Sequence, residues 1–191
     1  MKFSEVLKSI EKEKKKYAGI DKNTGIFLMN FCKAISARKI LEIGSGAGYS
    51  TIWLSKVAKE NSGKVISFEY NSCLAIKAEN NLKAANLEKF AEIKIRDALL
   101  CISDFEDSYF DFIFIDGSNR KYYQFIKNYQ TKLKKNGFIV CDNVKELVIA
   151  EKTRYQKLQM QKFLAEIKKD KDFEKILLDV GTGLVLLKKI T

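Results

Sequence analysis

The sequence predicts an α/β fold in which a doubly wound, mostly parallel, seven-stranded sheet ends in an antiparallel C-terminal hairpin. Three observations predict it. Short apolar runs alternate with stretches of helical spacing, a glycine-rich turn joins the first run directly to a helix, and only three residues separate the last two runs. Alternating strands and helices are typical of a parallel sheet covered by helices on both faces.

The expected elements follow one another regularly after a helical N-terminal region. Apolar residues at three- and four-residue spacing predict helices, and short apolar runs predict strands. The strands are expected at Lys39–Ile43, Lys64–Phe68, Ala91–Ile95, Phe110–Ile115 and Gly137–Cys141, and the helices at Tyr49–Lys59, Cys73–Ala85, Arg120–Leu133 and Arg154–Lys168. We expect a single domain over residues 1–191, with a helical region at 1–37 and a ligand-binding core at 38–191.

The alternation of strands and helices ends near the C-terminus. Two strand-like runs, Phe173–Val180 and Leu184–Lys189, are joined only by Gly181-Thr182-Gly183. Parallel strands need a long crossover, whereas a connection this short joins antiparallel neighbours. The last strand pair is therefore expected to be a hairpin.

Composition excludes several classes of function. The 191-residue chain contains no histidine, which removes Ser-His-Asp and Cys-His mechanisms. Its four cysteines are widely separated and form no CxxC pair, so we expect buried core residues in a reducing compartment and no zinc site. No signal peptide and no apolar run of membrane-spanning length is apparent, which favours a cytoplasmic protein without a membrane partner.

The net charge of +11 is unevenly distributed. The positive excess lies in residues 1–39 and 118–175, whereas residues 40–117 carry more acids than bases. A basic surface attracts polyanions such as RNA, or acidic small substrates. The alternative is a lysine-rich surface that is simply solvated.

The segment after the first strand has the character of a cofactor cradle. Glycines 44, 46 and 48 lead directly into a helix, and glycine allows positive φ and close approach of the backbone to a ligand. The alternative is a tight turn that binds nothing. Tyr49 stands where a dinucleotide motif has its third glycine, and no Gly-Lys-Ser/Thr of a phosphate-binding loop follows.

Each of the other parallel strands ends at an acid, where ligands bind in such sheets. Glu69 would accept from two ribose hydroxyls or be a solvated loop acid, and Asp97 would accept from an adenine amino group or cap the turn at 98–102. Asp116 follows a buried strand and would point into the cleft or cap the next helix. Asp142-Asn143 would cap a helix at 144–150 or, with Asp116, supply oxygen ligands to Mg²⁺.

Taken together, these motifs resemble the class I S-adenosylmethionine (SAM)-dependent methyltransferases, and within them the cation-dependent, catechol-type O-methyltransferases. The resemblance is carried by LEIGSGAGYS (41–50), Phe68-Glu69, Asp97-Ala98, FDFIFID (110–116), GFIVCDNV (137–144) and VGTGLVLL (180–187). It implies a Rossmann-like fold, SAM as cofactor and a divalent cation, with Mg²⁺ favoured.

The resemblance also implies residue roles. It places the methionine end of SAM at Glu42, Gly44 and Ser50, the ribose hydroxyls at Glu69, and the adenine beside Asp97 and Ala98. The remaining cradle residues are Ser45, Gly46, Gly48 and Tyr49. Asp116 would face both the methionine amino group and the cation, as a catalytic residue, and Asp142 and Asn143 would complete the cation's ligands.

One position departs from the family pattern. The lysine usual three residues after the first metal aspartate is Asn119 here, and Lys121 would replace it as a catalytic residue or be a solvated first-turn residue. We therefore expect a SAM-dependent, divalent-metal-assisted O-methyltransferase acting on a hydroxyl of a small phenolic or catechol-like substrate. The alternatives are methylation of a modified wobble uridine hydroxyl in tRNA by way of the basic flanks, and a binding module without activity. We also consider a second copy of the chain as a partner, in a homodimer.

Overall fold

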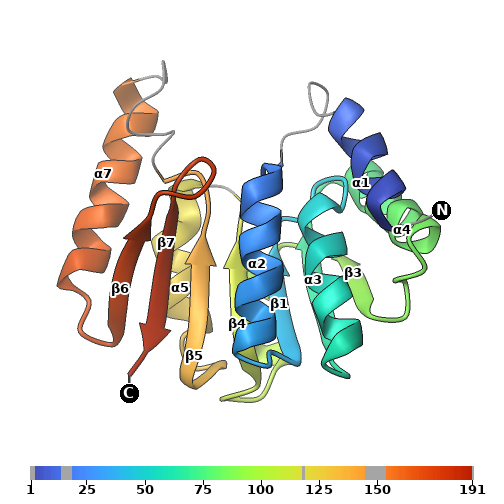
Figure 1. The fold of residues 1–191 in the computed structure, drawn as a ribbon. Coiled ribbons are helices and arrows are strands. Elements are labelled where there is room, and N and C mark those ends of the chain that lie inside the picture. The colour runs from blue at the N-terminus through green and yellow to red at the C-terminus, as the bar shows by residue number, and fades with distance from the viewer. Residues whose placement is uncertain (1–2, 14–18, 118, 145–153, 191) are drawn as a thin grey trace.

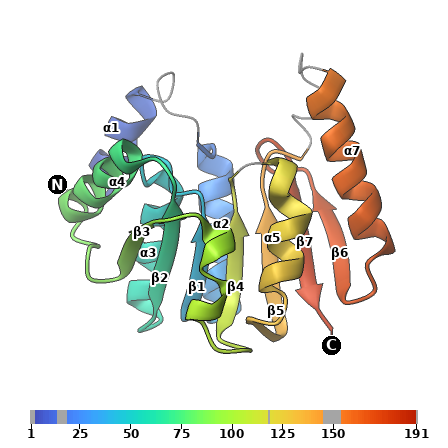
Figure 2. The ribbon, with the colours of Figure 1, turned by 180° about the vertical axis from the view of Figure 1, so that it is seen from behind.

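The computed structural model describes residues 3–13, 19–117, 119–144 and 154–190. A seven-stranded sheet forms its centre, with α2 and α3 on the face toward the viewer in Figure 1 and α5 and α7 on the other (Figure 2). The strands are β1 Lys39–Ile43, β2 Lys64–Glu69, β3 Ala91–Ile95, β4 Phe110–Ile115, β5 Leu133–Cys141, β6 Phe173–Leu178 and β7 Leu184–Lys189. The helices are α1 Phe3–Lys12, α2 Lys22–Ala34, α3 Tyr49–Glu60, α4 Ser72–Ala84, α5 Tyr122–Tyr129 and α7 Arg154–Lys169.

The strand order is β3-β2-β1-β4-β5-β7-β6. Strands β1 to β5 pair in parallel, and β7 is antiparallel to both β5 and β6. The chain adds β2 and β3 on one side of β1 and then crosses to β4 on the other side. A crevice forms beyond the carboxyl ends of strands where the order reverses in this way. The predicted doubly wound sheet with a C-terminal hairpin is confirmed, and the crevice lies between β1 and β4.

The sheet is buried because apolar side chains alternate to its two faces. On β4, Phe112 and Phe114 belong to the core cluster under α2 and α3, whereas Ile113 and Ile115 belong to the cluster under α5 and α7. All four are fully buried. A continuous apolar run is what a central strand covered on both faces requires.

Two predicted boundaries were wrong near Leu133. The helix expected to reach Leu133 ends at Tyr129, and β5 begins at Leu133, four residues before the expected start. Leu133 pairs with Phe110, and the register then shifts before Phe112 pairs with Phe138. Leu133 is buried in the same core cluster as α5, so its apolar character satisfies a helical pattern and a strand equally well.

Smaller differences concern turns, a cysteine and the hairpin. Residues 98–104 form two short 3-10 segments, and β6 ends at Leu178 rather than Val180. Cys73 is exposed, contrary to prediction, because it lies in the first turn of α4; the other three cysteines are buried. The helix expected over 144–150 lies outside the described residues except for Val144.

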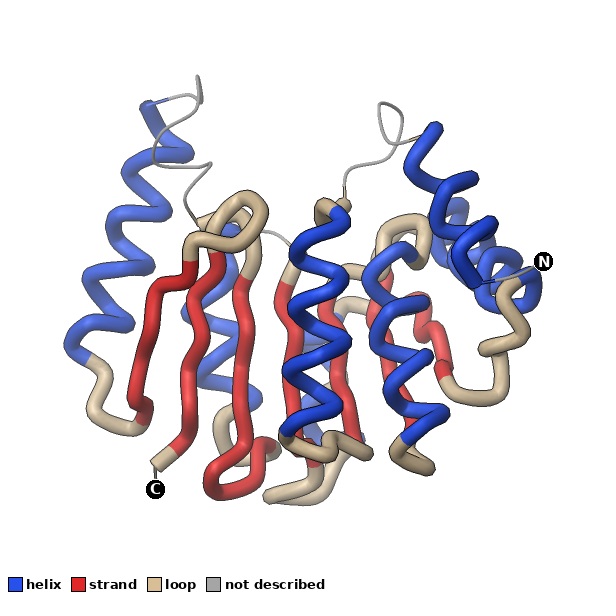
Figure 3. The backbone as a smooth tube through the Cα atoms, in the orientation of Figure 1, coloured by secondary structure: helices blue, strands red, loops and turns tan. Residues whose placement is uncertain are grey.

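In Figure 3 the described residues that directly follow β1, β2, β4 and β5 lie at one edge of the sheet, together with the β6–β7 turn. The described helices include none that is long and apolar enough to cross a membrane.

Candidate active site

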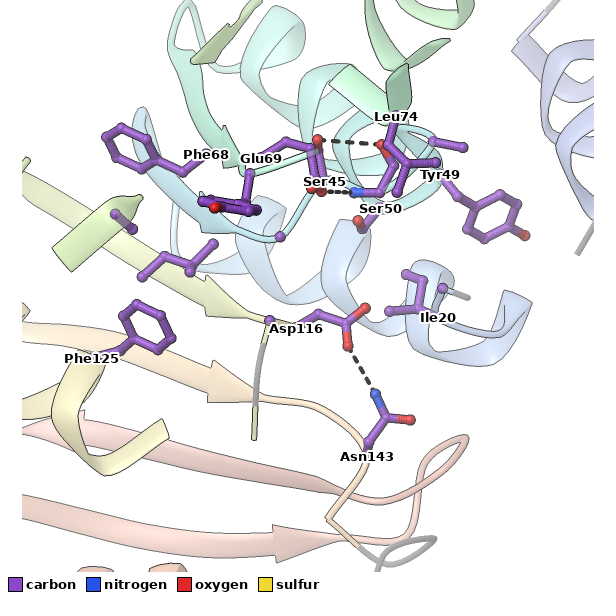
Figure 4. Close-up of a pocket in the computed structure, with 18 of the residues that line it drawn as sticks. Ile20, Ser45, Tyr49, Ser50, Phe68, Glu69, Leu74, Asp116, Phe125 and Asn143 are labelled. Carbon is purple, nitrogen blue, oxygen red and sulfur yellow. Dashed lines mark hydrogen bonds between the residues drawn. The ribbon is translucent and has the colours of Figure 1, made fainter. Parts of the chain in front are cut away.

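A cavity of about 1070 Å³ lies beyond the carboxyl ends of the parallel strands. The loops after β1, β2 and β4 line it, with further side chains from α1, α5, α7 and the β6–β7 turn. Figure 4 shows Glu69 and Ser45 on one side of this space and Asp116 and Asn143 on the other. The cavity is large enough for a nucleoside cofactor beside a small second molecule.

The glycine loop adopts a backbone conformation that side chains would obstruct. Gly44 has φ +99°, and a Cβ there would lie 2.7 Å from the carbonyl oxygen of Asp116. Gly48, the N-cap of α3, has φ +88°, and its Cβ would lie 2.9 Å from Ala78 Cα. L-residues rarely adopt these φ values, so glycine lets the end of β1 approach β4 and α4 closely.

Glu69 connects β2 to this loop. Its Oε2 accepts a hydrogen bond of 2.8 Å from the Gly46 N–H, and its Oε1 accepts one of 2.8 Å from the Asn71 N–H. A carboxylate has about four acceptor sites, so two remain for a ligand. Glu69 lines the cavity beside Ser45, Gly46, Tyr49 and Ser50.

Glu42 lies beneath the loop rather than on the cavity wall. It is fully buried and absent from the cavity lining. Its Oε2 accepts from the Thr51 and Ser67 hydroxyls at 2.5 Å each, while Oε1 lacks a partner among the described residues. Burial raises the pKa of Glu42. The structure therefore does not bring Glu42, or Gly48, into the cavity with the other cradle residues.

Asp97, Ala98 and Lys121 form another part of the wall. Asp97 Oδ1 accepts a 2.9 Å hydrogen bond from the Leu99 N–H, so it caps the 3-10 turn, which was the alternative role considered for it. Its Oδ2 lies 3.3 Å from the Lys121 ammonium. The Leu99 N–H lowers the pKa of Asp97, and the Lys121 charge adds to this. Lys121 is thus an ion-pair partner on the cavity wall, not a solvated residue alone.

Three predicted cation ligands converge at the opposite wall. Asn143 Nδ2 lies 2.8 Å from Asp116 Oδ1 and 3.4 Å from Asp142 Oδ2. Asp116 and Asn143 line the cavity, whereas Asp142 is fully buried behind them. Asn143 has φ +62°, a left-handed conformation that asparagine tolerates better than most residues.

The chemistry of these side chains fits a hard cation. Carboxylate and amide oxygens are ligands that a hard cation such as Mg²⁺ prefers, and a turn of the Asn143 amide would present its oxygen to the site in place of its nitrogen. Within the part of the chain that the structure describes, no three Asp, Glu, His or Cys side chains converge. The candidate ligand set is therefore two carboxylates and one amide.

Sequence reasoning missed several residues around the site. The Tyr122 hydroxyl donates to the Asp142 carbonyl at 3.1 Å, and the Tyr122 ring packs edge-on against Phe163. Burial raises the pKa of Tyr122, and the charge of Asp116 adds to this. The Tyr49 hydroxyl donates to Glu11 Oε1 at 2.5 Å, so α1 from the N-terminal region forms part of the cavity wall. No local pattern signals either contact.

Comparison with known proteins identifies the family. The family described as O-methyltransferase matches residues 2–190. The chain is 33% identical over 129 residues to a catechol O-methyltransferase of Niastella koreensis, covering 65% of this chain and 58% of the relative. It is 34% identical over 120 residues to one of Mycobacterium tuberculosis, covering 63% and 54%. The matches thus span somewhat more than half the length of these two curated relatives.

A longer match is to caffeoyl-CoA O-methyltransferase 1 of Eucalyptus globulus, with 28% identity over 185 residues that cover 87% of this chain and 73% of the relative. Among solved structures, an O-methyltransferase from Bacillus cereus in complex with SAH has a TM-score of 0.83 and 25% identity over 98% of this chain and 90% of that one. A putative caffeoyl-CoA O-methyltransferase from Staphylococcus aureus has a TM-score of 0.86 and 21% identity over 96% and 91%, which shows the shared fold. The resemblance drawn from the sequence motifs is confirmed, and the chain belongs to the O-methyltransferase family.

Proposed function

We propose that this protein transfers the methyl group of SAM to a hydroxyl of a small phenolic or catechol-like molecule, with a divalent cation, Mg²⁺ by preference, held by Asp116, Asp142 and Asn143. One observation carries the proposal: Asp116, Asp142 and Asn143 converge on one side of the cavity, and the glycine loop and Glu69 lie on the other side. Membership of the O-methyltransferase family and the two catechol O-methyltransferase relatives support it.

In this proposal the cavity wall holds SAM from end to end. Glu69 accepts from the ribose hydroxyls with the acceptor sites left free by Gly46 and Asn71. Asp97 and Ala98 border the adenine. Gly44, Ser45, Gly46, Tyr49 and Ser50 surround the methionine end, beneath which Glu42 and Gly48 support the loop, and Asp116 accepts from the amino group. Acidic groups suit a ligand that carries a sulfonium and an ammonium.

The chemistry is a displacement at the methyl carbon. The acceptor oxygen forms a bond to that carbon as the carbon–sulfur bond breaks, which leaves S-adenosylhomocysteine (SAH) and releases the hydroxyl proton. Holding donor and acceptor in line removes much of the entropic part of the barrier. The cavity supports such an in-line arrangement because the wall with Glu69 and Ser45 faces the wall with Asp116 and Asn143 across it (Figure 4).

A divalent cation, when bound, lowers the pKa of a coordinated hydroxyl and holds it in place. Asp116 and Asp142 would supply carboxylate oxygens, and Asn143 would supply its amide oxygen after turning. We assign Lys121 a supporting role: its ammonium would have to leave Asp97 and lose a proton before it could serve as a base. In this proposal Lys121 orients Asp97 at the adenine end.

The test is a labelled methyl-transfer assay with SAM against a panel of phenols, catechols and total tRNA. We expect label in a catechol when Mg²⁺ is present, loss of label with EDTA, and recovery when Mg²⁺ is restored. Asp116→Asn should lose most of this activity because it removes one ligand charge. Asp107→Asn, an exposed acid paired with Lys132 at the other end of the sheet, is the control and should retain activity.

Two outcomes would overturn parts of the proposal. No label in any acceptor with the native protein would contradict methyl transfer to a hydroxyl and leave the binding-module alternative. Undiminished transfer in EDTA would remove the cation from the mechanism while leaving the SAM chemistry in place.

A further inference from the structure

The turn between β6 and β7 contacts the loop that carries two of the candidate cation ligands. The Thr182 hydroxyl donates a 3.0 Å hydrogen bond to Asp142 Oδ1. The Gly183 carbonyl accepts a 3.0 Å hydrogen bond from the Val144 N–H. The turn is therefore attached to the ligand loop by one side-chain bond and one backbone bond.

Strand register explains why these distant segments meet. Strands β5 and β7 are antiparallel, with Cys141 opposite Val185. Asp142 directly follows Cys141, and the turn directly precedes Leu184, so the pairing brings the turn beside Asp142. Figure 1 shows the turn at the same edge of the sheet as the carboxyl end of β5.

The turn is also held from its other side. Gly181 has φ +56°, and a Cβ there would lie 2.1 Å from Oδ2 of Asp21, the N-cap residue of α2. Close packing against the start of α2 leaves the turn little room to move. Thr182 therefore presents its hydroxyl from a well-supported position, and it lines the cavity together with Asn143.

The two oxygens of Asp142 have different surroundings. Oδ1 accepts from Thr182, whereas Oδ2 faces the Asn143 amide, which in turn contacts Asp116. Because Asp142 is fully buried, its carboxylate cannot exchange these partners freely with solvent. The Thr182 hydroxyl thus selects which oxygen points toward the other candidate ligands.

We propose that Thr182 is a positioning residue for the cation site: its hydroxyl holds Oδ1 of Asp142 and thereby directs Oδ2 toward Asn143 and Asp116, so that Asp142 coordinates through this one oxygen. The inference rests on the cation site of the proposed function. Mg²⁺ takes single oxygens in a compact octahedron, whereas Ca²⁺ accepts both oxygens of a carboxylate at longer distances. Thr182 therefore favours a Mg²⁺-sized cation over Ca²⁺.

The backbone bond allows this role to be separated from a purely structural one. The Gly183–Val144 bond holds the turn without the Thr182 hydroxyl. Thr182→Val keeps the branched shape of the side chain and replaces the hydroxyl with a methyl group, whereas Thr182→Ser keeps the hydroxyl and removes the methyl group. The two variants thus distinguish positioning of Asp142 from support of the turn.

The experiment measures Mn²⁺ binding to the full chain by electron paramagnetic resonance of free Mn²⁺, with Ca²⁺ as competitor. We expect Thr182→Val to weaken Mn²⁺ binding roughly tenfold or more, as loss of a partner that orients a ligand commonly does. We also expect Ca²⁺ to compete better in this variant. Thr182→Ser should return both values to within about twofold of wild type.

Thr131→Val is the matched control. It removes a threonine hydroxyl beside Asp107, near the amino ends of β4 and β5 and away from the cavity, and it should leave Mn²⁺ affinity unchanged. Thermal unfolding of each variant checks the fold, and Thr182→Ala carries the same test if Thr182→Val does not fold.

The outcomes separate this inference from the proposed function. If the wild type binds no Mn²⁺, the cation site itself fails. If the wild type binds Mn²⁺ and Thr182→Val binds it equally well, the role of Thr182 alone is overturned. Failure of Thr182→Ser to restore binding would also overturn it, because the hydroxyl would not be the cause.

Discussion

At the scale of single residues, the site depends on places where a Cβ has no room. Gly44 combines φ +99° with a Cβ position 2.7 Å from the Asp116 carbonyl oxygen. Gly19 also lines the cavity, but a Cβ there would meet nothing within 4 Å. The two glycines are therefore a matched pair: the backbone conformation and close neighbours at Gly44 require glycine, whereas those at Gly19 do not.

We expect Gly44→Ala to lower the free energy of unfolding by about 1–3 kcal/mol, because the alanine must hold a strained φ or push β4 away. SAM binding should weaken as well, since the loop and Asp116 would separate. Urea unfolding and calorimetric titration with SAM measure the two effects. Gly19→Ala should leave the free energy of unfolding unchanged, and an equal loss of stability in the two variants would contradict this account of Gly44.

The carboxylates show how far residue-level prediction reaches. Glu69, Asp97 and Asp116 were expected at strand ends, and all three line the cavity. Glu42 was expected with them but lies opposite Ser67 in the strand register, under α3, where Thr51 and Ser67 hold it. A strand turns successive side chains to opposite faces, so proximity in sequence to the loop did not bring Glu42 to the cavity.

At the scale of elements, Asp111 ties together the starts of three strands. Its Oδ2 accepts from the backbone N–H groups of Arg38 at 2.8 Å and Lys39 at 2.7 Å, and its Oδ1 accepts from the Lys134 ammonium at 2.5 Å. Partial burial acts to raise the pKa of Asp111, but the hydrogen bonds from Lys134 and the two backbone groups lower it overall. The charged carboxylate therefore stabilises the junction of β1, β4 and β5.

We expect Asp111→Asn to lower the free energy of unfolding at pH 7 by about 1.5–3 kcal/mol, the range for hydrogen bonds to a charged group. Because the folded pKa lies below the unfolded value of about 3.9, this stabilisation is complete above that value and is lost as the pH falls through the folded pKa. Urea unfolding at pH 7 and at pH 3 should show a smaller difference at pH 3. A difference independent of pH would show that shape, not charge, matters at this junction.

At the scale of the whole molecule, the net charge of +11 makes salt dependence a test that distinguishes an RNA substrate from a neutral phenol. Binding of RNA through several phosphates falls by about 10³ to 10⁵ between 50 and 200 mM salt when six to ten contacts form, whereas a neutral phenol has no such dependence. We expect methyl transfer to a catechol to change less than about twofold over this range. Initial rates across a KCl series measure it, and a steep fall with label in tRNA would favour the RNA alternative.

The sequence by itself determined the order of elements, the glycine loop and the acids at the strand ends. These features depend on local physics: hydrophobic period, the conformational freedom of glycine, and the strand ends that parallel pairing brings to one edge. The boundary at Leu133 was mistaken because an apolar residue there fits a helix and a strand alike.

Only the tertiary structure decided which side chains meet across the site. Thr182 reaches Asp142, Lys121 pairs with Asp97, and Tyr49 contacts Glu11, although 24 to 40 residues separate the partners. Such contacts depend on strand register, side-chain direction and the packing of α1, none of which a local pattern encodes. The same physics leaves Glu42 and Asp142 fully buried behind the wall of the cavity.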